Sequence, residues 1–245
     1  MMTLIFGHRG AAGTMPENTM ISFEKAIQSG ADGIELDVHL SKDQIPVVIH
    51  DETVDRTASG TGLVNEYLAE ELVLMDASWK FNAYQHQAKI PLLEEVLEWA
   101  SGSRDPFILN IELKNNIIDY PGLEESVIHL IKKYGLADRV ILSSFNHASM
   151  VQAIKIEPGI ETALLYTDGI YKPYDYARKA GARAIHPLLR TVRNELIALS
   201  RENSISVRPF TVNEEQDMRM LFEWGSDGFF TDYPEKAAEI RNSLK

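Results

Sequence analysis

Cysteine is absent from the 245-residue chain, so the sequence offers neither a disulfide framework nor a thiolate metal site. Long apolar runs are absent too, and none approaches the ~20 residues that span a bilayer. The opening MMTLIF has no basic segment before its apolar residues, which argues against a secretory signal. Together these absences predict a cytoplasmic protein.

Positive charge is also scarce, because 24 Lys and Arg residues stand against 36 Asp and Glu residues and leave a formal net charge of −12. Such a surface repels a nucleic-acid backbone and an anionic membrane. We therefore expect no nucleic-acid partner and no stable membrane association. A substrate that carries phosphate would need local positive charge or a bound metal ion. Nothing in the sequence favours one oligomeric state over another.

Apolar runs and helix-like patterns alternate along almost the whole chain. The expected strands are Thr3–His8, Gly33–Leu40, Phe107–Leu113, Arg139–Ser143, Glu161–Tyr166, Ala182–His186, Ile205–Phe210 and Asp227–Thr231. The expected helices are Asn18–Ser29, Leu92–Ser101, Gly122–Tyr134, His147–Ile156, Tyr174–Ala180, Thr191–Glu202, Glu214–Trp224 and Pro234–Asn242. Eight such units predict an α/β fold, a (β/α)8 TIM barrel that forms a single domain over residues 1–245.

One apolar run falls outside this alternation. Ile45–His50 follows the second expected strand after only a short polar stretch, whereas a parallel neighbour needs a crossover of about a dozen residues or more. We therefore expect an antiparallel hairpin strand that carries His50 toward the barrel mouth. The next stretch, residues 51–89, is far longer than a strand-to-helix loop of about 2–6 residues. It predicts an inserted subdomain.

Charged side chains gather at the expected strand ends. The first strand ends at His8 and Arg9, and the hairpin strand ends at His50. Residues two apart on a strand face the same side. Glu35 with Asp37, and Glu112 with Lys114, therefore form two inward-facing pairs on the second and third barrel strands.

Three carboxylates that meet in one barrel mouth would repel each other unless a cation lay among them. Ligation by oxygen without cysteine favours Mg²⁺ or Ca²⁺ over zinc. Each pattern alone has an ordinary structural explanation: an ExD pair can be a solvated strand edge, and a histidine at a strand end can be a hydrogen-bonded structural residue. Only their conjunction at consecutive strand ends indicates a site.

The stretch GHRGAAGTMPENTMISFEKAIQSGADGIELDVHLSKDQIPVVIHDETVDRTASGTG resembles the opening of the glycerophosphodiester phosphodiesterase family, a phosphatidylinositol-phospholipase-like group. The HRG, PENT, ExD and HD elements stand in that family's order and spacing. The likeness continues through MDASWKF, IPLLEEVL, NIELK, SSF, FTVN and GFFTDYP, and so covers nearly the whole chain.

The resemblance implies a TIM barrel with a small insertion and a metal-dependent phosphodiesterase with one divalent cation. By this likeness the chain would hydrolyse a small-molecule glycerophosphodiester to sn-glycerol 3-phosphate and an alcohol, in glycerophospholipid degradation. The implied site residues are the catalytic His8 and His50, the metal ligands Glu35, Asp37 and Glu112, and the phosphate-binding Arg9 and Lys114. Phe210 stands where the family usually has tryptophan, in a substrate pocket, which leaves the head-group preference open.

Three rival functions stay open at this point. A barrel could bind phosphodiesters without cleaving them, Lys114 could act as a Schiff-base amine, or the chain could be a lipase for intact phospholipid. Paired histidines argue against a barrel that only binds. A lysine that stays protonated argues against a Schiff base, and an acidic surface argues against a lipase for intact phospholipid.

Several further residues have two interpretations. His39 and His186 could be structural or reach the site, and Trp79, Phe81 and Tyr84 could form a small core or face the leaving alcohol. In PENT, Asn18 or Thr19 is expected to cap the first helix.

Overall fold

The computed structural model of the chain describes residues 2–78 and 81–244. The parallel strands are short and buried. They are β1 (Leu4–Gly7), β2 (Gly33–Leu40), β4 (Ile108–Leu113), β5 (Val140–Ser144), β6 (Glu161–Tyr166), β7 (Ala184–Pro187), β8 (Ser206–Val207) and β9 (Gly228–Thr231). β3 (Pro46–Val48) pairs antiparallel with β2, which confirms the expected hairpin.

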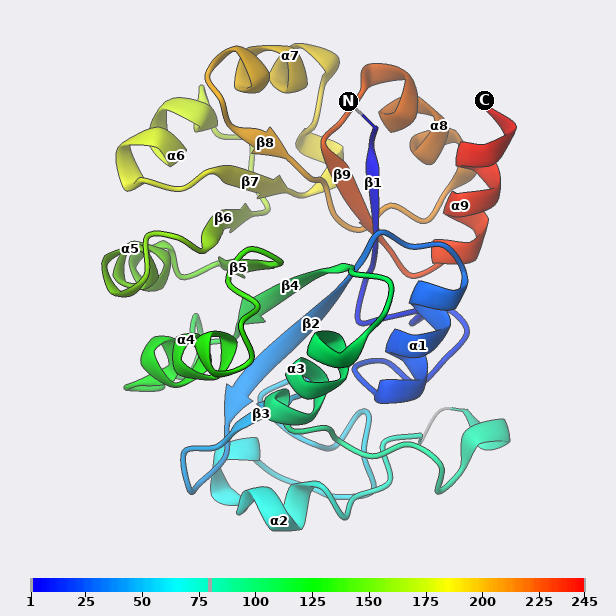
Figure 1. The fold of residues 1–245 in the computed structure, drawn as a ribbon, viewed down its shortest axis with the longest axis vertical. Helices are drawn as coiled ribbons and strands as arrows, with labels where there is room; N and C mark the ends of the chain where they lie inside the picture. Colours follow the sequence, from blue (N-terminus) through cyan, green and yellow to red (C-terminus); the bar gives the residue numbers. More distant parts are fainter. Residues whose placement is uncertain (1, 79–80, 245) are drawn as a thin grey trace.

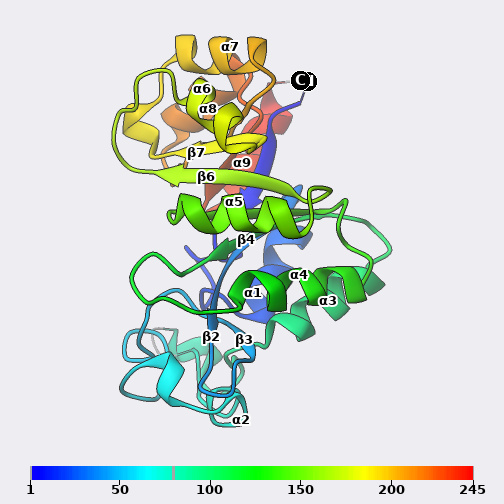
Figure 2. The same ribbon diagram turned by 90° about the vertical axis from the view of Figure 1, so that its left-hand side faces the viewer.

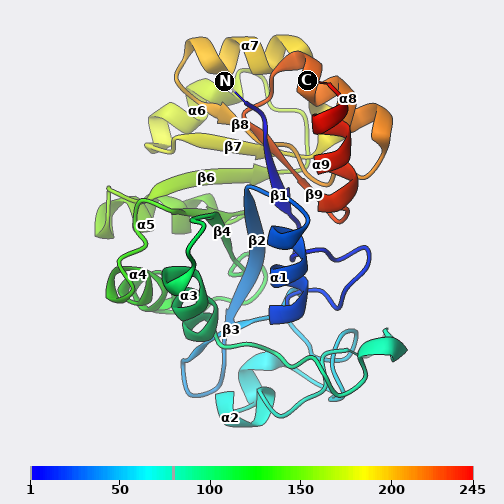
Figure 3. The same cartoon turned by 45° about the vertical axis from the view of Figure 1, so that its right-hand side comes forward.

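A helix follows each parallel strand, after the 51–89 segment in the case of β2. The helices around the barrel are α1 (Met20–Gln28), α3 (Leu93–Gly102), α4 (Leu123–Lys133), α5 (His147–Ile156), α6 (Pro173–Ala180), α7 (Asn194–Glu202), α8 (Glu215–Trp224) and α9 (Pro234–Ser243). Figures 1 and 3 show them as an outer layer around the strands. The strand order is β8-β7-β6-β5-β4-β2-β1-β9. The predicted (β/α)8 barrel is confirmed.

The barrel closes between its last two strands through residues that follow β8. The Phe230 N–H donates to the carbonyl of Pro209 at 3.0 Å, and the Val212 N–H donates to the carbonyl of Phe230 at 2.8 Å. The strand predicted over Ile205–Phe210 is therefore shorter than expected. Pro209 has no N–H to donate, which interrupts the ladder and leaves Phe210 in an isolated bridge with Leu188.

The first helix also begins later than expected. Thr19 occupies the N-cap position with an extended backbone, although its side chain makes no capping hydrogen bond, and Asn18 has a left-handed backbone with φ at 55°. The predicted capping role is therefore wrong for Asn18. Asparagine tolerates this conformation better than most side chains. The Asn18 side chain instead turns to the barrel mouth.

The apolar core has three parts. The largest lies between the strands and the helix layer, where Phe229 on β9 packs edge-on against Phe222 on α8. A second fills the barrel interior around Phe6 and Phe230, whose ring centroids are 5.2 Å apart. None of the described helices is long and apolar enough to cross a bilayer.

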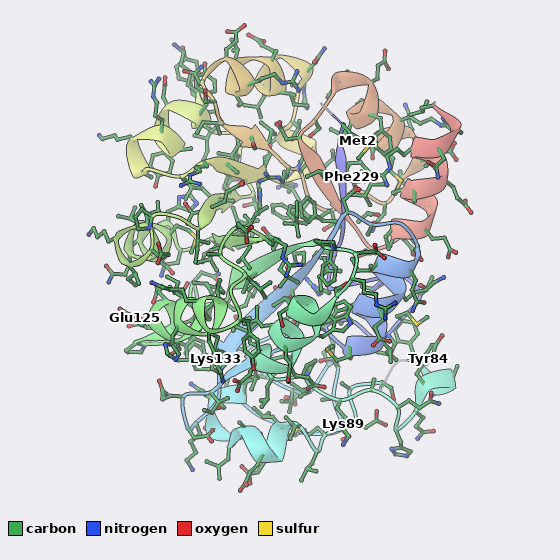
Figure 4. The ribbon with its side chains drawn as sticks, viewed as in Figure 1. Met2, Tyr84, Lys89, Glu125, Lys133 and Phe229 are labelled. Carbon is green, nitrogen blue, oxygen red and sulfur yellow. The ribbon has the colours of Figure 1, made fainter. Side chains whose placement is uncertain are left out.

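The third part of the core lies under the 51–89 segment, which holds η1 (Val64–Glu66), α2 (Ala69–Leu72) and η2 (Asn82–Tyr84). Figures 1 and 2 show this segment at the end of the molecule opposite the two termini, and Figure 4 labels Tyr84 and Lys89 there. Its core is mainly aliphatic, with Val54, Val64 and Leu72 fully buried. The predicted aromatic core is wrong for Phe81 and Tyr84, which are only half-buried, and Trp79 lies outside the described residues.

Candidate active site

Three carboxylates meet at the carboxyl ends of β2 and β4. The parallel register places Asp37 directly beside Glu112, and Glu35 lies two residues before Asp37 on the same face. One oxygen from each of the three groups lies within 4.8 Å of the others, and all three residues are buried. The structure therefore brings together the residues that the resemblance implied as metal ligands.

This arrangement is electrostatically costly for the protein alone. Burial raises the pKa of Glu35 well above its ordinary value, and repulsion from Asp37 and Glu112 raises it further. Burial likewise raises the pKa of Glu112 to about 7, although Lys114 offsets part of the effect. The Glu35 Oε1 atom is buried and has no hydrogen-bond partner among the residues that the structure describes. Clustered, buried oxygens with an unsatisfied acceptor fit a hard divalent cation.

Asp37 is the member of the cluster that neighbouring donors keep ionised. Burial would raise its pKa, but Arg9, Lys114 and a hydrogen bond from Asn18 hold it well below the ordinary range. The Asn18 Nδ2 atom donates to Asp37 Oδ2 at 2.8 Å. The left-handed turn at Asn18 thus serves the site rather than the helix.

Arg9 lies beside the cluster with two different kinds of contact. Its backbone, left-handed with φ at 51°, lets the N–H donate to Glu35 Oε2 at 2.8 Å. Its guanidinium donates to Glu17 Oε1 at 2.9 Å and lies 3.4 Å from Asp37 Oδ2. Next to it, a Cβ on Gly10 would lie 2.3 Å from Ser22 Oγ. Gly10 therefore lets the loop pack against α1.

Lys114 lies on the opposite side of the cluster. Its Nζ atom donates to Glu112 Oε1 at 2.9 Å and lies 3.8 Å from Asp37 Oδ1. Burial by itself would lower the pKa of Lys114, but the two carboxylates raise it above its ordinary value. Two cations, Arg9 and Lys114, therefore flank the acidic cluster, and both stay charged.

His8, at the end of β1, is oriented from the far end of the chain. Its Nδ1 atom lies 2.7 Å from Asp232 Oδ1, and Asn213 donates to the other oxygen of Asp232 at 2.6 Å. Burial would raise the pKa of Asp232, but hydrogen bonds from His8 and Asn213 lower it. Because an ionised carboxylate only accepts, Nδ1 carries the proton, and Nε2 is left for chemistry.

His50, at the end of the hairpin strand, has a similar partner. Its Nδ1 atom lies 2.6 Å from Asp51 Oδ1, while its Nε2 atom lies 3.3 Å from Lys114 Nζ. Since a protonated lysine only donates, Nε2 accepts that hydrogen bond. Burial lowers the pKa of His50, and the nearby cations lower it further, although Asp37 and Asp51 offset part of the shift.

His39 has a structural role, although it shares a face with Glu35 and Asp37. It is fully buried, and its Nε2 atom lies 3.0 Å from the backbone carbonyl of His50. A carbonyl only accepts, so Nε2 donates and Nδ1 accepts from the Tyr120 hydroxyl at 3.0 Å. His39 thus anchors the backbone that presents His50.

His186 and Phe210, from the other side of the barrel, reach the same interior space. A cavity of about 20 Å³ is lined by His8, Glu35, Asn110, Glu112, Leu165, His186, Phe210 and Phe230. That volume suits about one water molecule. Both ring nitrogens of His186 are buried without a protein partner, and its ring lies 4.9 Å from that of Phe230. Phe210 also packs edge-on against Phe145, at 5.9 Å.

Among the polar residues that contact the site without a role assigned from the sequence alone are Glu17, Arg56, Asn213 and Asp232. A signal existed for three of them, because Glu17 lies in PENT, Asn213 in FTVN and Asp232 in GFFTDYP. Each follows or precedes an element end, where site residues gather in a barrel. Their partners, however, lie as far as 224 residues away in sequence.

Comparison with known proteins finds one family along nearly the whole chain. The model of the glycerophosphoryl diester phosphodiesterase family matches residues 8–236. The chain is 46% identical to a glycerophosphodiester phosphodiesterase of Bacillus altitudinis, over the whole of both chains. It is 43% identical to the one from Caldanaerobacter subterraneus, over 96% of each.

A solved structure shares the overall fold. The phosphodiesterase of Oleispira antarctica, in complex with the product sn-glycerol-3-phosphate, superposes with a TM-score of 0.86 at 31% identity, over 98% of this chain and 97% of that one. With a barrel, a buried acidic cluster and a family match over nearly all its length, the chain belongs to the glycerophosphoryl diester phosphodiesterase family.

Proposed function

We propose that the protein hydrolyses glycerophosphodiesters to sn-glycerol 3-phosphate and an alcohol, a step of glycerophospholipid degradation. The observation that carries the proposal is the convergence, at one barrel mouth, of three buried carboxylates, two flanking cations and two histidines that are each held by an aspartate. A metal site, phosphate-binding charge and a pair of proton-transfer groups are what cleavage of a phosphodiester requires.

We further propose that activity depends on one divalent cation, Mg²⁺ or Ca²⁺, held by Glu35, Asp37 and Glu112. The unsatisfied Glu35 Oε1 and the mutual repulsion of the three groups support this. When bound, such an ion neutralises the charge that develops on the phosphoryl oxygens. Arg9 and Lys114 add donors from either side of the cluster. Arg9 presents a forked guanidinium, and Lys114 a compact ammonium.

The two histidines divide the proton transfers between them. His50 is neutral near pH 7, because burial lowers its pKa, and its Nε2 atom already acts as an acceptor for Lys114. We assign it the role of general base. His8 then acts as the general acid, with Asp232 holding the ring through Nδ1. His8 thus transfers its proton from Nε2, whereas the Nε2 atom of His50 takes the substrate proton in place of its hydrogen bond from Lys114.

The attacking group is then a hydroxyl of the substrate. Neither histidine motif supplies a serine or cysteine nucleophile. The 2-hydroxyl of glycerol is tethered next to phosphorus and so gains the advantage of an intramolecular reaction. His50 removes its proton, the oxygen–phosphorus bond forms as the bond to the alcohol breaks, and His8 protonates the leaving alkoxide. Water then opens the resulting cyclic phosphate.

The rival reaction through Lys114 has less support. A Schiff base forms from a neutral amine, whereas Glu112 and Asp37 raise the pKa of Lys114 and keep it charged. Borohydride trapping with a carbonyl substrate would distinguish the two reactions.

The test is a substrate panel of glycerophosphocholine, glycerophosphoethanolamine and glycerophosphoglycerol, assayed for released glycerol 3-phosphate with Mg²⁺, with Ca²⁺ and without metal. We expect release from at least one substrate, and only with a cation. Absence of release from all three would contradict the proposed reaction. Equal release after exhaustive chelation would contradict the metal requirement alone.

A further inference from the structure

Arg56 lies in the 51–89 segment, six residues after His50, and its guanidinium contacts two carboxylates at once. The contacts to Asp51 are 2.6 Å from Nε to Oδ2 and 2.9 Å from Nη2 to Oδ1. The contacts to Glu17 are 2.7 Å from Nη1 to Oε2 and 2.8 Å from Nη2 to Oε1. Both pairs are therefore forked, the geometry that gives arginine its directional specificity.

Each of these carboxylates holds a residue of the proposed site. Asp51 accepts from Nδ1 of His50 through Oδ1, and Glu17 accepts from the guanidinium of Arg9 through Oε1. A single side chain thus lies one contact away from the proposed base and from a proposed phosphate ligand. Its two hydrogen bonds to Glu17 join the 51–89 segment to the PENT loop, and its two to Asp51 lie within the segment.

The sharing of Glu17 has a consequence for Arg9. Arg56 binds both oxygens of Glu17, whereas Arg9 binds only one. If Arg56 were absent, both oxygens of Glu17 would be available to Arg9. The Arg9 guanidinium would then be drawn toward Glu17, and less of its charge would face a phosphate. Asp51 would at the same time lose the two donors that hold its carboxylate plane, leaving His50 free to rotate with it.

We propose that Arg56 is a positioning residue that sets the orientations of His50 and Arg9 together, so that the 51–89 segment takes part in the chemistry without touching the substrate. This inference rests on the proposed function. A purely structural role would lower stability but leave the properties of the folded enzyme unchanged. A positioning role alters both proton transfer and phosphate binding in enzyme that remains folded.

The experiment compares Arg56→Ala and Arg56→Lys with the matched control Arg178→Ala, which breaks an exposed arginine–aspartate pair of 2.9 Å on α6. Steady-state rates with glycerophosphocholine give kcat and KM, and circular dichroism gives the folded fraction. Misplacement of a reacting group by about 1 Å can cost about 10²-fold in rate. We expect Arg56→Ala to lose about that much in kcat/KM, and Arg56→Lys, which cannot make a forked pair of hydrogen bonds to each carboxylate, to lose about tenfold.

Two single-sided variants make the interpretation specific. Asp51→Asn acts directly on the His50 side and should mainly lower kcat, whereas Glu17→Gln acts directly on the Arg9 side and should mainly raise KM and the inhibition constant of inorganic phosphate. Arg56→Ala should show both effects, and added guanidinium should restore part of the activity. The Arg56→Lys variant carries the test if Arg56→Ala does not fold.

The proposal is overturned if the Arg56 variants, corrected for folded fraction, match Arg178→Ala within about twofold in both kcat and KM, where about 10²-fold was expected. It is also overturned if only one of the two parameters changes. In either case active wild-type enzyme would leave the proposed phosphodiesterase function intact. Inactive wild-type enzyme would instead contradict that function itself.

Discussion

The two sides of the barrel mouth differ in what they present. Neighbouring strands β1, β2 and β4, with the hairpin strand β3, bring the charged residues of the site together. The opposite side, from β7 to β9, presents mainly aromatic rings and a neutral imidazole: Phe210, Phe230 and His186. The charged side holds the groups that the proposed phosphate binding and proton transfers use, whereas on the aromatic side Phe230 and His186 are buried in the barrel interior and Phe210 is half-buried. Substitutions on the charged side should therefore cost the most activity.

Removing the cation should have the largest effect. A metal ion supplies several kcal/mol of transition-state stabilisation, so we expect chelation to lower kcat more than about 10³-fold. Glu112→Gln should weaken both metal affinity, measured by calorimetry, and the rate. Exposed Glu24 provides the control, as Glu24→Gln should change neither. Undiminished activity after chelation would contradict the proposal that the carboxylates of the charged side hold a cation needed for activity.

Loss of either histidine should be the next largest effect. Losing a positioned proton-transfer group costs about 10²–10⁴ in rate, so we expect His8→Ala and His50→Ala to lose kcat on that scale while binding substrate. The exposed His129→Ala variant is the control. A glycerophosphodiester with a p-nitrophenol leaving group should rescue His8→Ala, because that group leaves without an acid. Rescue of His50→Ala alone would reverse the assignment.

The substrate itself can be altered on the same side of the mouth. A 2-deoxy analogue of glycerophosphocholine lacks the tethered hydroxyl, and we expect its kcat to be lower by more than about 10²-fold because the intramolecular advantage is lost. Phosphorus NMR should detect a cyclic phosphate with the parent substrate only. Equal kcat for the two substrates would favour direct attack by water.

The charged residues at the barrel mouth are the part of the site that the sequence could predict. His8, Glu35, Asp37, Glu112 and Lys114 lie on or directly after strands, where the two-residue period determines which side chains share a face. What the sequence could not supply was the set of partners, such as Asp232 for His8 or Glu17 for Arg56, because those contacts depend on how distant loops pack. Asn18 shows the same limit: its capping pattern was plausible, but a contact with Asp37 determined its conformation.

His186, on the aromatic side, should affect stability more than rate, because it makes the free energy of unfolding depend on pH. Burial lowers its pKa well below the ordinary value, and Arg208 adds to the shift, so the ring stays neutral when folded. The unfolded chain takes up a proton below about pH 6.5, and this favours unfolding as the pH falls. The contribution is about 1.4 kcal/mol per pH unit below that point.

The measurement is urea unfolding of wild type and His186→Leu at pH 7.5 and pH 5.5. Other groups titrate in both proteins. The informative quantity is therefore the difference between wild type and variant in the slope of unfolding free energy against pH. The variant should lose less stability on acidification, by about 1 kcal/mol. Equal slopes would show that His186 is not held neutral by its surroundings.

Substitution of Phe210 should have the smallest effect on kcat/KM, and it tests which part of the substrate the aromatic side contacts. It lines the interior cavity with His8, Glu35 and Glu112 and is held edge-on by Phe145. If it contacts the glycerol portion, which all substrates share, Phe210→Trp should change kcat/KM for the three head groups in parallel. The change should be about threefold, since Trp keeps the apolar face and adds one N–H donor. Phe210→Leu, measured with the same panel, separates ring contact from mere volume, and a parallel rise in KM is expected there too. A change in the ratios between head groups would instead place Phe210 against the leaving alcohol, and the aromatic side would then determine which substrates are preferred.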